Sequence, residues 1–177
     1  MNMAIDVYYR AENAIVAGIT FTHWRACEPD RELVTWVSKV DSYEPGHFYR
    51  RELPGMLELL NQTDLLPGYI VIDGYVYLGP DEKPGLGKHL YDALNARSAI
   101  IGVAKNRFKD TPAEAELIRG NSKRPLYITS VGVSQMEAKQ LISSMCGEYR
   151  LPTLLKKVDQ LCRSELYLQF RSDRNAS

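Results

Sequence analysis

Four residues of the sequence have types and positions that could support metal-ion chemistry: Asp6, Glu52, Asp73 and Lys105. Asp73 ends the apolar run Y-I-V-I and is followed at once by Gly74, which is typical of a strand buried on both faces. Because an unpaired carboxylate loses its hydration on burial, we expect Asp73 to meet a cation or several hydrogen-bond donors. The alternative for Asp73 is an ordinary cap on a turn or helix that follows the strand.

Asp6 interrupts the first apolar run of the chain and could share an ion with Asp73. Adjacent strands lie about 4.8 Å apart, so the two aspartates would come close together if their strands are neighbours. Carboxylates held that close repel one another unless a cation neutralises them. Oxygen ligands and retained waters suit Mg²⁺ and Mn²⁺, and either ion would activate a water and stabilise charge on a phosphate.

Glu52 and Lys105 could complete such a site. Glu52 follows two arginines at the head of an expected helix, where a negative charge is favourable in any case. Lys105 ends an expected buried strand beside that of Asp73, so its ammonium could stabilise negative charge on a phosphate in the transition state. The common alternative for a strand-terminal lysine is an ammonium that reaches into solvent.

The spacing of apolar residues predicts the elements that must position these side chains. Strands are predicted at residues 4–9, 14–22, 33–40, 68–80, 99–104 and 125–130. Helices are predicted at residues 48–61, 85–97, 111–119, 134–149 and 152–163, with Pro54 in the first turn of the first one. Three strands in series followed by strand–helix units predict an α/β fold with a mixed five- to six-stranded sheet and helices on both faces.

Length and composition are those of one ordinary globular domain, predicted at residues 1–170 with a flexible tail at 171–177. Lys plus Arg (22) equal Asp plus Glu (22), so the net charge gives no sign of strong nonspecific binding to nucleic acid or membranes. Three unpatterned cysteines argue against a disulfide framework and are typical of a reducing compartment. Because the sequence contains no signal peptide or membrane-spanning run, a cytoplasmic location is expected. A monomer is expected as well.

Seven stretches, in order along the chain, resemble the endonuclease V family of nucleases, which has a ribonuclease H-like fold. The matching stretches are I-D-V-Y-Y, S-Y-E-P-G-H-F-Y-R-R-E-L-P, Y-I-V-I-D-G, G-L-G-K-H-L, I-G-V-A-K, R-P-L-Y-I-T-S-V-G and Y-R-L-P. They span nearly the whole chain, and the central three are specific. The resemblance therefore implies a ribonuclease H-like mixed sheet.

The resemblance also implies an activity and a cofactor. The family cuts DNA or RNA near deaminated bases, notably inosine, at the second phosphodiester on the 3′ side. It uses Mg²⁺ or Mn²⁺ and leaves a 3′-hydroxyl and a 5′-phosphate. We therefore expect a metal-dependent endonuclease of DNA repair. Its partner is expected to be DNA or RNA that contains deaminated bases.

Residue roles follow from the matched positions. By resemblance, the metal-binding acids are Asp6, Glu52 and Asp73, and the catalytic lysine is Lys105. Substrate-binding residues are implied in a strand-separating wedge and in a pocket for the extruded base: Tyr43 and Pro45 in the wedge, and Gly46 and Gly74 in the pocket. The alternative for Tyr43 is a half-buried loop aromatic.

Two departures from the family pattern leave other functions open. The family has His-Pro six residues after the acid that matches Asp73, and Gly-His after a late strand, this second His helping to hold the metal. Here Gly79 and Val133 occupy those positions. A catalytically weakened relative that binds deaminated or distorted nucleic acid without cutting is therefore the alternative, and a protein-interaction module on the same fold is a third reading.

Overall fold

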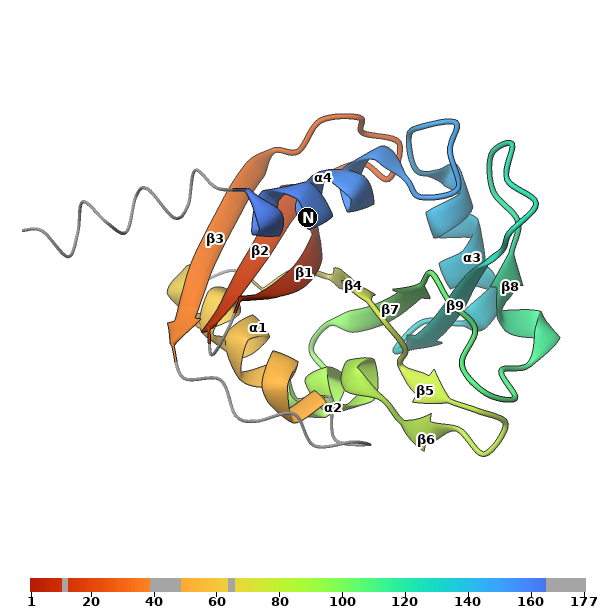
Figure 1. Cartoon of the computed structure of the whole chain (residues 1–177), viewed down its shortest axis with the longest axis horizontal. Coiled ribbons are helices and arrows are strands. Elements are labelled where there is room, and N and C mark those ends of the chain that lie inside the picture. The colour runs from red at the N-terminus through yellow and green to blue at the C-terminus, as the bar shows by residue number, and fades with distance from the viewer. Residues whose placement is uncertain (11–12, 39–48, 64–65, 165–177) are drawn as a thin grey trace, which may run out of the picture.

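A seven-stranded mixed sheet lies at the centre of the chain in the computed structural model, which describes residues 1–10, 13–38, 49–63 and 66–164 (Figure 1). The strand order is β3-β2-β1-β4-β7-β9-β8. In chain order these strands are β1 (Asn2–Arg10), β2 (Asn13–Phe21), β3 (Arg31–Ser38), β4 (Tyr69–Asp73), β7 (Ala99–Ala104), β8 (Glu116–Leu117) and β9 (Leu126–Val131). A separate hairpin consists of β5 (Tyr77–Leu78) and β6 (Lys83–Pro84).

Strand pairing confirms the predicted arrangement at the centre of the sheet. β1, β2 and β3 form an antiparallel meander, as three β-rich runs with short connections predict. β4 then pairs with β1 in parallel, and β7 pairs with β4 in parallel. The first and fourth strands of the prediction are therefore neighbours, and the strand that precedes Lys105 lies beside that of Asp73.

Helices cover both faces of the sheet, as predicted. α1 (Tyr49–Thr63) and α2 (Leu86–Ala93) pack against one face, and α3 (Gln135–Ser144) and α4 (Thr153–Arg163) against the other. Successive strand residues point to opposite faces, so Ala4 packs on the α4 side while Met3 and Ile5 pack on the α1 side. In Figure 1, α4 crosses over β1 and β2, and α1 lies on the far side of the same strands.

Some predicted elements differ from the observed ones. Residues 111–119 were expected as a helix but form one 3₁₀ turn, Ala113–Ala115, followed by β8. Pairing of β8 with β9 outweighs a weak local helix signal, and it raises the sheet to seven strands. Pro54 lies inside α1 and not in its first turn, because the helix begins at Tyr49. α2 ends at Ala93, before Asn95 and Ala96 adopt positive φ angles.

The cysteines also differ from expectation. Cys27, in the connection between β2 and β3, forms a disulfide with Cys146, which follows α3. The two residues are 119 positions apart, so no local spacing signals the pair. Cys162 on α4 is buried and free. In the described part of the chain, no helix has the length and apolar character needed to cross a bilayer.

Candidate metal and phosphodiesterase site

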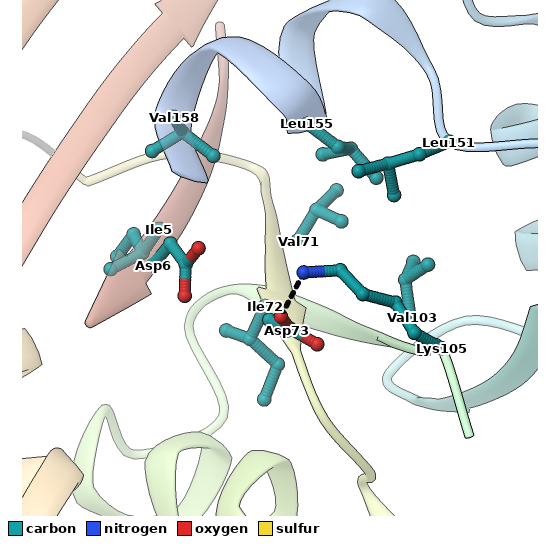
Figure 2. A pocket seen from close by; sticks show the side chains of 10 residues that line it. All are labelled: Ile5, Asp6, Val71, Ile72, Asp73, Val103, Lys105, Leu151, Leu155 and Val158. Carbon is teal, nitrogen blue, oxygen red and sulfur yellow. Dashed lines mark hydrogen bonds and ion pairs between the residues drawn. The ribbon is translucent and has the colours of Figure 1, made fainter. Parts of the chain in front are cut away.

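Strand register brings three of the expected site residues to the α4 face of the sheet. Ile5 pairs with Ile72, so Asp6 and Asp73 follow at the same level on adjacent parallel strands. Asp73 in turn pairs with Val103, two residues before Lys105. Because side chains alternate along a strand, Asp6, Asp73 and Lys105 all point to the same face. Figure 2 shows their polar ends directed into one small pocket beneath α4.

α4 supplies a third carboxylate that the sequence did not single out. One carboxylate oxygen from each of Asp6, Asp73 and Asp159 lies within 4.8 Å of the other two. Asp159 follows Val158, which is buried against the sheet, so its side chain borders the apolar face of the helix. An acid at the border of a strongly amphipathic helix is the only sequence signal that could have found it.

Lys105 does not reach into open solvent, which was the alternative for this residue. Its Nζ lies 2.7 Å from Oδ2 of Asp73 and 3.5 Å from Oδ1 of Asp159 (Figure 2 marks the first contact). Asp73 is more exposed than its apolar strand predicted, with 37% of its side chain accessible, but it meets the expected cation. Arg163 makes a second contact with Asp159, from Nε to Oδ1 at 3.2 Å. The carboxylates are thus only partly neutralised.

Burial and mutual repulsion perturb the acids strongly. Burial, followed by the charge of Asp73, raises the pKa of Asp6 to about 7. Although burial opposes the change, Lys105 and Arg163 lower the pKa of Asp159. Two acids next to each other, one favouring its proton and one ionised, indicate a site with excess negative potential. Carboxylate oxygens are the donor set of Mg²⁺ and Mn²⁺, so the residues present fit a divalent cation.

Glu52 approaches from the opposite face of the sheet. It lies in the first turn of α1 and only 7% of it is exposed. Burial, followed by the charges of Asp6 and Asp73, raises the pKa of Glu52 to about 8. The charges of Asp6 and Asp73 therefore act on the Glu52 carboxyl, but Glu52 does not belong to the close group of Asp6, Asp73 and Asp159. The simpler reading, a favourable charge at a helix N-terminus, does not account for a buried carboxyl with a raised pKa.

Residues around the acids hold the site in shape. Gly74 adopts a φ of +136° directly after Asp73, and its N–H donates to the carbonyl of Val103 at 3.2 Å. A Cβ at Gly102 would lie 2.6 Å from the Gly74 carbonyl, so the two strands approach closely here. Arg150, from the Y-R-L-P stretch, donates through Nη1 to the carbonyl of Lys105 at 3.2 Å.

The predicted wedge and base pocket are only partly visible. Tyr43, Pro45 and Gly46 lie outside the described residues, so their roles stay predictions. Gly74 directly follows Asp73 at the end of β4, and its role in a base pocket stays a prediction.

The two departures from the family pattern lie away from the carboxylates. Gly79 and Val133 both line a separate cavity between the β5–β6 hairpin and the segment from β9 to α3. Neither Asp6, Asp73 nor Asp159 lines this cavity. Val133 therefore does not occupy a place in the carboxylate group, where Asp159 supplies the additional acid.

Comparison with known proteins agrees with this geometry. The sequence model of the family described as Endonuclease V matches residues 2–127. Among curated relatives, endonuclease V of Streptomyces coelicolor is 28% identical over 185 residues, covering 92% of this chain and 77% of the relative. Endonuclease V of Alkalilimnicola ehrlichii is also 28% identical, over 143 residues that cover 70% of this chain and 62% of the relative.

Solved structures show the same fold. Human ENDOV superimposes with a TM-score of 0.77 at 21% identity, covering 95% of this chain and 84% of that chain. Ciona intestinalis endonuclease V, crystallised with a 24mer DNA containing an inosine followed by a ribo-adenosine, gives a TM-score of 0.77 at 18% identity. That comparison covers 94% of this chain and 85% of the other. The predicted ribonuclease H-like fold is confirmed.

Proposed function

The chain belongs to the endonuclease V family of endonucleases, and from that premise we propose that it is a metal-dependent enzyme that cuts DNA or RNA beside deaminated bases such as inosine. The observation that carries the proposal is the group of Asp6, Asp73 and Asp159 with Lys105 beside it. A metal-dependent nuclease uses a cation site next to a positive group, and these residues offer both.

The acids would hold Mg²⁺ or Mn²⁺. Asp6, Asp73 and Asp159 present oxygens close enough to share one ion, and Glu52 adds a carboxyl from the other side of the sheet. When bound, the ion supplies an activated water and stabilises negative charge on the phosphate. The proton on Asp6 would leave as the ion binds, because ligands must be deprotonated.

Lys105 would stabilise the charge that develops on the phosphate oxygens during attack by water. Asp73 and Asp159 hold its ammonium on the α4 face, where the substrate phosphate would lie. The bond between phosphorus and the 3′ oxygen would break, leaving a 3′-hydroxyl and a 5′-phosphate. Arg150 would keep the Lys105 backbone in place through its carbonyl.

The substrate class rests on the family and on one structural neighbour. The Ciona intestinalis protein is bound to inosine-containing DNA, and this chain has the same fold. Reading a deaminated base requires that it leave the stack, and Gly74 would line the receiving pocket together with Gly46. Tyr43 and Pro45 would act as the wedge. Loss of the histidines at Gly79 and Val133 does not touch the carboxylates, which favours cutting over binding alone.

The test is cleavage of end-labelled oligonucleotides that carry one inosine, as DNA and as RNA, single- and double-stranded. We expect a cut one nucleotide past inosine with Mg²⁺ or Mn²⁺ and none with EDTA. Asp73→Asn should abolish it, whereas Asp92→Asn should cut like the parent. Asp92 is a matched control because it is also paired with a lysine, Lys88, but lies on α2.

Other outcomes separate the alternatives. Inosine-selective binding without any cut would mean that the chain is a binder and that the proposed chemistry is wrong. Cleavage that persists in Asp73→Asn would mean that the carboxylate group is not the site. If the protein neither binds nor cuts the inosine oligonucleotides, it has the family's fold but not this function.

A further inference from the structure

An aromatic ring stands exposed on the loop that follows Lys105. Phe108 is 44% exposed and lies three residues beyond the lysine. Three residues span at most about 10 Å, so the backbone of Phe108 lies within about that distance of the backbone of Lys105. A single exposed apolar residue is common and by itself means little. Phe108 differs because hydrogen bonds hold its loop in place and because the loop is positively charged.

The loop is held rigidly by hydrogen bonds to the strand end that carries Asp73. The hydroxyl of Tyr75 donates to the carbonyl of Asn106 at 2.8 Å and accepts from the N–H of Phe108 at 3.0 Å. The N–H and hydroxyl of Thr111 both donate to the Phe108 carbonyl, at 3.1 and 2.8 Å. These hydrogen bonds fix the backbone of Phe108. Its ring packs edge-on against that of Tyr75, with the two ring centroids 6.1 Å apart.

The same loop carries positive charge. Lys105, Arg107 and Lys109 alternate along it, and Arg107 and Lys109 are exposed. Arg107 also donates to the carbonyl of Thr111 at 2.8 Å, which further orders the loop. An ordered aromatic with interleaved cations is the arrangement with which proteins bind single-stranded nucleic acid, because bases stack on the ring and phosphates meet the cations.

We propose that Phe108 is a stacking platform for one base of the substrate strand, within about three nucleotides of the cut, with Lys109 contacting a neighbouring phosphate. The inference rests on the proposed function, since it needs a nucleic-acid strand at Lys105. A base stacked on Phe108 would hold the strand in register and so place the scissile phosphate at the carboxylates. The sequence tolerance of stacking would leave base selection to the inosine pocket.

The experiment measures KM and kcat for inosine oligonucleotides cut by Phe108→Leu and Phe108→Trp. Leucine keeps apolar bulk but has no π face, so KM should rise about five- to a hundredfold with kcat little changed. Tryptophan should keep a KM near that of the parent. Met136→Leu is the matched control, because Met136 is an exposed apolar residue on α3.

A substrate series then identifies the base. Single abasic nucleotides are placed in turn at each position within three nucleotides of the cut. At one position, the abasic site should raise the KM of the parent by about the same factor as Phe108→Leu does with the intact substrate. When Phe108→Leu cuts that abasic substrate, KM should rise no further. A purely structural role of the ring would not be cancelled by removing one base.

Two results would overturn this inference and leave the proposed function standing. One is a Phe108→Leu enzyme that cuts with the parent's KM. The other is a raised KM that no abasic position absorbs, which would mean that the ring only supports the loop. If the parent cuts no inosine oligonucleotide at all, the proposed function fails and the inference fails with it.

Discussion

At the scale of single residues, the site is defined by carboxyl groups that favour their protons. Asp6 has a pKa of about 7 and Glu52 one of about 8, both raised first by burial and then by neighbouring acids. Burial strengthens the repulsion between these carboxylates, and a bound divalent cation would relieve it. Protons and metal ions therefore compete for the same oxygens.

Metal binding should release protons near neutral pH. At pH 7, Asp6 is about half protonated and Glu52 mostly protonated, so Mn²⁺ binding that deprotonates both should release between about one and two protons. Apparent affinity should rise as the pH rises from 6 to 9. Calorimetric titration in two buffers of different ionisation enthalpy measures the release. Affinity that is independent of pH, with no buffer dependence, would contradict it.

The stability of the metal-free protein should depend on pH in the opposite sense to metal affinity. The folded pKa of Glu52 lies above its unfolded value, so the folded state binds the proton more tightly and stability rises as the pH falls from about 8 towards 5. Glu52→Gln removes the buried charge and should stabilise the metal-free protein at pH 8 by roughly 1–2 kcal/mol while it abolishes cleavage. Thermal unfolding at pH 5 and pH 8 tests this, with the exposed Glu58→Gln of α1 as control.

At the scale of elements, the sequence predicts the central strands of the sheet and the four helices that cover it. The strands that carry or precede Asp6, Asp73 and Lys105 are predominantly apolar, so both their existence and their order could be predicted. Which face each acid takes depends on register, which the pairing of β1 with β4 settles. Asp159 escaped prediction because only the packing of α4 across β1 and β2 brings it to the site. Residues 111–119 were mispredicted as a helix because Glu116 and Leu117 within them pair with β9.

α4 should therefore contribute to cleavage through the side chain of Asp159. Asp159→Asn is expected to raise the Mn²⁺ concentration needed for half-maximal cleavage more than tenfold, since one of three close oxygen donors is weakened. Asp159 also pairs with Arg163, so Arg163→Gln serves as the control for loss of that ion pair alone. Equal effects of the two variants would mean that Asp159 has a structural role and is not a metal ligand.

At the scale of the whole molecule, a covalent link joins distant parts of the chain. The disulfide between Cys27 and Cys146 connects the β2–β3 connection to the end of α3. Arg119 donates to the carbonyls of Met145, Cys146 and Tyr149, and this ties β8 to the same turn. α4 follows this turn directly, so the link supports the element that carries Asp159.

Reduction should lower stability without removing the site. A disulfide that closes so long a loop stabilises by about 2–4 kcal/mol, so the midpoint of denaturation should fall on adding reductant and in Cys27→Ser. Cleavage under native conditions should persist, because neither cysteine lines the carboxylate pocket. Thiol titration of the unfolded, unreduced protein should find one free thiol, that of Cys162. Three free thiols would contradict the link.

The most direct measurement is the position of Mn²⁺ in crystals of the protein, located by anomalous scattering at an ion concentration that supports cleavage of an inosine oligonucleotide. The account predicts a peak within coordination distance of carboxylate oxygens of Asp6, Asp73 and Asp159, and its loss in Asp73→Asn. No peak among these residues while cleavage proceeds, or an ion held only elsewhere, would contradict the claim that they hold the catalytic metal.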